Sequence, residues 1–281
     1  ILAASISTCI RSKTWSPYDL IVISLSSSRF ILLSWIILDL LMSIFCECSD
    51  YEENNSVAAN ILYMLLNCSS LWFGAWLSVF YCIKVASFPH SFFIRLKQRI
   101  ARLVPWVLLT SWLFSVTASI PFAWDVYRMH NNFTAPSSTT NSSAMRTTRK
   151  DRLTLLIYLC NASTALPLIL SVVSSVLLIR SLWKHTGRMQ NNASGFRDPS
   201  LEAHMKAIKS VCSFLILYIT YFISLLLLLY SDFLPLGDEE SICVALIAAC
   251  PTGHTLILIW SNPKFRELSA RIWNHINSRV R

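Results

Sequence analysis

The chain has 281 residues, of which 54% are hydrophobic and 14% are charged, and its formal net charge is +9. An ordinary soluble domain carries about 25% charged residues, so this composition excludes one and indicates a protein that crosses the membrane several times. The basic residues lie in short segments between apolar runs and not on one helix face, so we expect no nucleic-acid partner.

The first apolar segment covers only residues 1–10, and the chain begins with Ile1 in place of methionine. We expect this segment to be the end of a first membrane span that is truncated in the chain. After a short basic loop, residues 18–45 form the second predicted span, which is long enough to cross the hydrocarbon core. Arg29 lies near its middle, where a cation is expensive and is a functional candidate by default. A structural role, in which the guanidinium bonds to neighbouring helices, is an equal alternative.

An acidic segment separates the second span from the third, which we place at residues 57–87. Tyr63 and Asn67 share one face of this helix, because they are four residues apart. A polar amide in lipid needs a partner, so Asn67 either forms a hydrogen bond to another helix or contacts a ligand. Four Lys or Arg residues follow between residues 95 and 102, as expected at a cytoplasmic face.

The fourth predicted span covers residues 103–124. The segment after it, residues 125–151, is rich in Ser, Thr and Asn and contains sequons for N-glycosylation at Asn132 and Asn141. Because this longest loop is predicted to lie outside, either asparagine is a candidate for carrying a glycan.

The fifth span is predicted at residues 153–179 and the sixth at residues 208–231, with a basic inner loop between them. In that loop Asp198 and Pro199 have the pattern of a helix cap followed by the first helical residue. A helix leading into the sixth span should therefore begin at Pro199.

The seventh span covers residues 241–262, and the tail, residues 263–281, is basic with apolar residues on one face. Such a tail should lie along the inner membrane surface. The inner loops and the tail carry 17 Lys or Arg residues, whereas the outer loops carry five. This is the positive-inside pattern with the amino terminus outside. The predicted fold is thus all-α: a single domain that is a seven-transmembrane helix bundle, with residues 263–281 as its cytoplasmic tail.

The sequence has no pattern that indicates an enzyme. The five glycines form no nucleotide-binding motif, the six histidines form no metalloprotease motif, and no pair of carboxylates lies inside a span. The nine cysteines lack the spacing of metal ligands. We therefore predict no catalytic residues, no metal and no cofactor. His254 is the one histidine at membrane depth, where a hydrogen-bonded structural imidazole is favoured over a ligand contact.

Four segments resemble motifs of the type 2 (bitter) taste receptors, a family of G-protein-coupled receptors. Residues 80–88, FYCIKVASF, are similar to the family's FYxxKIAxF at the end of the third span. Residues 25–29, in the second span, are similar to the family's LxxSR. Residues 184–209 resemble KHTxxM…GxRDPSxxAHxxAxK, and residues 254–264 resemble HSxxLIxxNxKLK. The resemblance covers essentially the whole chain after residue 11. The chain departs from these motifs at Val85, Ser87 and Thr255.

The resemblance implies a bitter taste receptor in the plasma membrane, which binds small bitter compounds within the helix bundle and activates a heterotrimeric G protein of the gustducin type, leading to calcium release. By position in the family, the ligand-binding residues are Tyr63, Asn67, Tyr221 and Val244. Helix packing is the alternative role for the two tyrosines. A valine at position 244 cannot pair with a cationic ligand, which argues against a main specificity for amines.

The candidates for the switch and for G-protein coupling are Arg29, Tyr81, Lys84 and His254. The basic loops at residues 89–102 and 180–209 are candidates for the G-protein surface, although positive-inside charge explains most of their individual residues. The alternative function is that of a non-signalling membrane protein such as a small-molecule transporter. A transporter would be expected to show internal repeats and intramembrane acids, which the sequence does not show.

Overall fold

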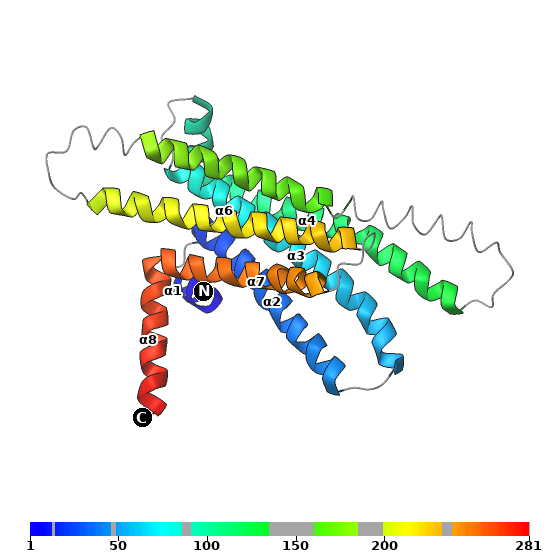
Figure 1. Ribbon diagram of the computed structural model, residues 1–281. Helices are drawn as coiled ribbons and strands as arrows, with labels where there is room; N and C mark the ends of the chain where they lie inside the picture. Colours follow the sequence, from blue (N-terminus) through cyan, green and yellow to red (C-terminus); the bar gives the residue numbers. More distant parts are fainter. Residues whose placement is uncertain are drawn as a thin grey trace.

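The computed structural model is built from α-helices, and the part of the chain that it describes contains no strand (Figure 1). The helices are α1 (Leu2–Ser12), α2 (Pro17–Phe45), α3 (Ser49–Val85), α4 (Ser91–Thr134), α6 (Pro199–Ser231), α7 (Asp238–Ser261) and α8 (Pro263–Val280), together with the helix Asn161–Lys184. The described residues are 1–12, 15–45, 49–85, 91–134, 159, 161–184, 199–231 and 238–280.

Four helical segments of the described chain are long and apolar enough to cross a membrane: Pro17–Leu38, Ile61–Val85, Phe93–Pro121 and Asn161–Lys184. Shorter apolar segments lie in α6 and α7. Large apolar side chains such as Trp106 and Trp260 are exposed on the surface of the bundle, which is where they would meet lipid. The predicted all-α membrane bundle is confirmed.

Several helices are longer than the apolar runs from which spans were predicted. Helix α3 begins at Ser49, within the acidic segment, and α4 extends from Ser91 to Thr134, beyond the apolar residues 103–124 on both sides. Charged residues such as Glu, Lys and Arg are good helix formers, so hydropathy marks the lipid-embedded part of a helix and not its ends. Helix α6 begins at Pro199 as predicted.

The largest buried cluster joins α2 and α3 to α4, α7 and α8. Ile21, Val22 and Leu25 of α2 pack there against apolar side chains of the neighbouring helices, including Phe80 of α3 and Phe265 of α8. Figure 1 shows α8 leaving the end of α7 at a steep angle. The cluster therefore fixes the start of α8 to the bundle.

The turn between α7 and α8 has a specific local cause. Pro263 has no N–H for a continuing helix, and its fixed φ suits the first position of a new one. Asn262, between the two helices, donates its side-chain amide to the phenolic oxygen of Tyr18 at 2.9 Å. The junction of α7 and α8 is thus tied to the first turn of α2.

Small hydroxyl residues fill the contact between α3 and α4. Ser111, Ser115 and Ser119 of α4 are buried, and each donates its hydroxyl to the carbonyl oxygen four residues earlier, at 2.6–2.9 Å. The indole N–H of Trp76 donates to the hydroxyl oxygen of Ser111 at 2.7 Å. Small side chains let helices approach closely in lipid, so this packing suits a membrane bundle.

Six cysteines of the described chain are free, and all but Cys212 are buried. The buried thiols are Cys9, Cys68, Cys82, Cys243 and Cys250. They are distributed over α1, α3 and α7 and serve as small side chains in the packed interior.

Candidate functional site

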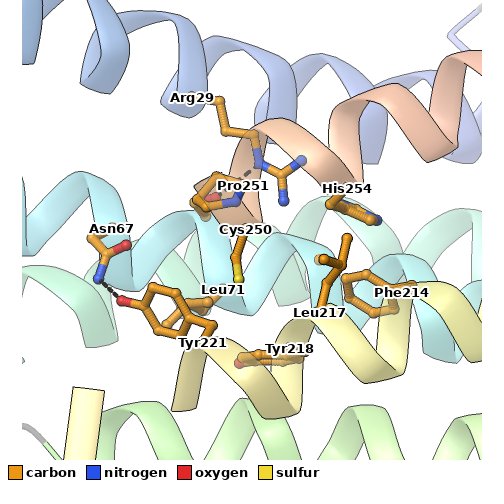
Figure 2. A pocket seen from close by; sticks show the side chains of 12 residues that line it. Arg29, Asn67, Leu71, Phe214, Leu217, Tyr218, Tyr221, Cys250, Pro251 and His254 are labelled. Atoms are coloured by element: carbon orange, nitrogen blue, oxygen red, sulfur yellow. Dashed lines mark hydrogen bonds between the residues drawn. The ribbon is translucent and has the colours of Figure 1, made fainter. Parts of the chain in front are cut away.

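A cavity of about 30 Å³ lies between α3, α6 and α7, with Arg29 of α2 beside it (Figure 2). A single water needs roughly 10–15 Å³ by this measure, so the cavity has the size of a small ion or a few waters. Four of the residues predicted from sequence line it, namely Arg29, Asn67, Tyr221 and His254. They come from four different helices.

At one end of the cavity, the side-chain amide of Asn67 donates a hydrogen bond to the phenolic oxygen of Tyr221 (Figure 2). Both side chains are buried, and Tyr221 is only 2% exposed. Of the two predictions for Asn67, the interhelical hydrogen bond is therefore present. The ring of Tyr218 lies 6.5 Å from that of Tyr221 between centroids, so two aromatic faces of α6 border this end.

At the other end, Arg29 bridges two helices. Its Nε donates to the hydroxyl of Ser70 in α3 at 3.2 Å, and its Nη1 donates to the hydroxyl of Thr255 in α7 at 3.0 Å. The Thr255 hydroxyl in turn donates to the carbonyl oxygen of Pro251 at 2.9 Å. A planar guanidinium suits this position, because its fork of donors can reach two neighbouring helices at once.

His254 packs against an aromatic ring. Its imidazole lies 4.1 Å from the ring of Phe214 between centroids and is 6% exposed. Its Nδ1 has no hydrogen-bond partner among the described residues. The hydrogen-bonded structural imidazole therefore stays a prediction, and the contact that the structure describes is the packing on Phe214.

Tyr81 and Lys84 lie apart from the cavity, near the end of α3. The ring of Tyr81 is 6.1 Å from that of Tyr18 and 6.5 Å from that of Phe80. Lys84 is exposed, and its Nζ lies 5.7 Å from the Phe80 ring centroid, a distance suitable for a cation–π contact. The four predicted switch residues thus form two groups.

The other predicted residues are placed as follows. Tyr63 is half-buried on α3, one turn from Asn67, and is not among the residues that line the cavity. Val244 lies in α7, but its side chain is outside the described residues. Asn132 lies in the last turn of α4 with its side chain likewise outside the described part, and Asn141 is not described at all.

Sequence reasoning missed Ser70, Phe214, Leu217 and Tyr218, which also line the cavity. A signal was available for two of them. Ser70 is three residues after Asn67, and Tyr218 is three residues before Tyr221. Residues three apart share a helix face, so each lies beside a residue that had been chosen.

The cavity presents aromatic faces, hydroxyl groups, an amide and a guanidinium, which are groups that orient a small ligand within a largely apolar pocket. Among the described residues, no group of three or more His, Cys, Asp or Glu could hold a metal ion. The lining is therefore chemically suited to a small polar or ionic group.

Comparison with known proteins identifies the family of the chain. The profile of the family described as taste receptor protein (TAS2R) matches residues 1–277. Taste receptor type 2 member 40 of Gallus gallus is 59% identical over 281 residues, which are all of this chain and 90% of the relative. Taste receptor type 2 member 39 of Homo sapiens is 34% identical, covering 100% of this chain and 81% of the relative. Taste receptor type 2 member 7 of Papio hamadryas is 35% identical, covering 94% and 83%.

Proposed function

Because the chain belongs to the taste receptor type 2 family, whose members are bitter taste receptors and not enzymes, we propose that it binds small bitter compounds in the cavity lined by Asn67 and Tyr221. Binding there activates a heterotrimeric G protein of the gustducin type at the plasma membrane and leads to calcium release. The observation that supports this most is that Arg29, Asn67, Tyr221 and His254 come from four helices and line one cavity.

The size of the cavity supports a coupling between ligand binding and helix movement. Pockets that hold drug-sized ligands measure about 300–1,000 Å³, whereas this cavity is about 30 Å³. A bitter compound must therefore separate α6 and α7 from α3 as it enters. A ligand changes a conformational equilibrium only by binding one state better, and here the wider arrangement would be the one that it favours.

The Asn67–Tyr221 hydrogen bond is the contact that an entering ligand would exchange. A ligand with its own acceptor can take the Asn67 amide, and one with a donor can bind the Tyr221 oxygen, so that this hydrogen bond no longer links α3 to α6. Tyr63, one turn away on α3, and Val244 of α7 would extend the ligand-binding site at this end.

The inner-face network is proposed to consist of Arg29, His254, Tyr81 and Lys84. Arg29 and His254 border the cavity, while Tyr81 packs against Tyr18. Tyr18 also accepts the hydrogen bond of Asn262 at the end of α7. A movement of α7 caused by the ligand would therefore change the surroundings of Tyr81 and Lys84, where we place coupling to the G protein.

The experiment that tests this is calcium imaging of cells that express the receptor with a chimeric Gα, against a panel of bitter compounds. Variants Asn67→Leu and Tyr221→Phe test the cavity, and Tyr81→Ala and Lys84→Ala test coupling, all at matched surface expression. Trp260→Leu is the matched control, because Trp260 is 81% exposed on the surface of α7.

We expect a response that requires the Gα. The cavity variants should raise the agonist concentration for half-maximal response by about tenfold, as expected for a loss of roughly 1.4 kcal/mol. The coupling variants should reduce its maximum. Unchanged potency in both cavity variants would place the ligand elsewhere. Substrate flux without a requirement for Gα would instead favour a transporter.

A further inference from the structure

The buried cation at the Arg29 end of the cavity has only neutral partners in the described part of the chain. Its two hydrogen bonds go to the hydroxyls of Ser70 and Thr255, and no acidic side chain of the described residues contacts it. A buried charge is costly unless it is paired. Two hydroxyl oxygens satisfy hydrogen-bonding geometry but do not balance a full positive charge.

The guanidinium also has donors to spare. Arginine has five N–H groups, and Arg29 uses one on Nε and one on Nη1 for the described partners. The Thr255 hydroxyl is already committed as a donor to the carbonyl of Pro251, so towards Arg29 it serves as an acceptor. Three N–H groups of Arg29 remain for a further acceptor, and Arg29 lines the cavity.

Other donors adjoin the same space. The imidazole of His254 lines the cavity, is 94% buried and has a Nδ1 without a described partner. A neutral imidazole can carry its proton on either nitrogen, so Nδ1–H can donate to an acceptor beside Arg29. Ser70 also lines the cavity, and its hydroxyl accepts from Arg29 while its own hydrogen is given to no described acceptor.

We propose that the Arg29 end of the cavity binds a compact monovalent anion, either a free halide or the carboxylate group of an acidic ligand. The charge comes from Arg29, and the remaining donors come from Ser70 and His254. The cavity volume of about 30 Å³ fits a halide or one carboxylate group, and the rest of an acidic ligand enters only with the widening of the cavity proposed above. The halide form stands without the proposed function, whereas the carboxylate form rests on it.

A bound anion would strengthen the bridge between helices. Arg29 is carried by α2, Ser70 by α3 and His254 by α7. An anion that accepts from these side chains would pair the buried charge and hold the three helices together. Its binding should therefore stabilise the folded protein. Once the anion concentration exceeds the dissociation constant, the stabilisation should rise with the logarithm of that concentration.

The test is the thermal unfolding midpoint, Tm, of the purified receptor in nanodiscs at constant ionic strength. One arm compares sodium chloride and bromide with sodium methanesulfonate, which has no carboxylate group, and a second compares sodium benzoate with its neutral analogue benzamide. The variants are Arg29→Gln and Ser70→Ala. Arg271→Gln is the control for a general salt effect, because Arg271 is exposed and pairs with Glu267 on α8.

For a free halide, we expect Tm in chloride or bromide to lie on the order of 2–4 °C above Tm in methanesulfonate, and to keep rising with the logarithm of the halide concentration. For a ligand-borne carboxylate, benzoate but not benzamide should raise Tm. Arg29→Gln should abolish the rise, while Arg271→Gln should keep it. If Arg29→Gln does not fold, the test relies on Ser70→Ala. This variant should need a several-fold higher anion concentration for the same rise in Tm.

An equal Tm in all these salts, or an anion response that Ser70→Ala leaves unchanged, would overturn the proposal. This readout involves neither agonist nor G protein. A failure of the anion site and a failure of the receptor function are therefore distinguishable.

Discussion

The side-chain amide of Asn67 in α3 donates a hydrogen bond to the phenolic oxygen of Tyr221 in α6, and both groups are buried beside the cavity. The two residues are 154 positions apart in the chain. This hydrogen bond is a direct link between α3 and α6 at the place where we propose that the ligand binds.

Removing either partner of this bond should destabilise the protein, and removing both should cost little more than removing one. Tyr221→Phe leaves the Asn67 amide without its acceptor, and we expect a loss of about 1 kcal/mol. A double-mutant cycle of Asn67→Leu and Tyr221→Phe, followed by Tm, should show coupling of at least roughly 0.5 kcal/mol. Strictly additive effects would contradict a direct bond.

The Arg29–Thr255 bond predicts different effects for two substitutions at one position. Thr255→Val keeps the shape of the side chain but removes the acceptor for Nη1 of Arg29, whereas Thr255→Ser keeps the hydroxyl. We expect Thr255→Val to lower Tm by about 2–4 °C and Thr255→Ser to leave it nearly unchanged. If both variants unfold at the same temperature as the parent, the bond contributes nothing to stability.

The two glycines that face α6 should tolerate a methyl group differently. A Cβ at Gly74 would lie 3.6 Å from the Phe214 ring, an ordinary contact, whereas one at Gly253 would lie 3.2 Å from a terminal methyl of Leu217. Gly74→Ala should therefore leave Tm unchanged or raise it, because alanine is the better helix former by about 1 kcal/mol. Gly253→Ala should raise Tm less than Gly74→Ala, since Leu217 must shift to make room for the methyl group. A larger gain at Gly253 would contradict this packing.

The sequons make a prediction about N-glycosylation. Asn132 lies in the last helical turn of α4, whereas sequons are modified in exposed loops. We therefore expect Asn141→Gln to remove the shift in electrophoretic mobility caused by glycosidase treatment, and Asn132→Gln to retain it. The reverse result would show that the end of α4 is accessible to the transferase.

The sequence predicted the chemical character of the cavity better than its contacts. Arg29, Asn67 and His254 were selected because polar groups are expensive in an apolar helix, and this reasoning depends on one helix at a time. Which side chain each one meets depends on helix rotation and on α6, which hydropathy does not determine. For this reason an interhelical hydrogen bond of Asn67 was one alternative among two, its partner Tyr221 was not predicted, and the packing of His254 on Phe214 was missed.

Tyr81 and Lys84 show the same limit. The resemblance grouped them with Arg29 and His254 as switch residues, but position along a motif does not give distance in space. The structure places them with Tyr18 and Phe80 near the end of α3, away from the cavity. Helix ends could not be predicted from hydropathy either, because polar helical turns continue beyond the apolar runs.

The buried thiols of the bundle provide an unfolding reporter that needs no introduced cysteine. Cys9, Cys68, Cys82, Cys243 and Cys250 are each at most 6% exposed, and a thiol inside packed helices is shielded from a soluble maleimide dye. As the helices separate on heating, these thiols become reactive and the dye becomes fluorescent. Because they are carried by α1, α3 and α7, single cysteine-to-alanine variants would show which of these helices opens first.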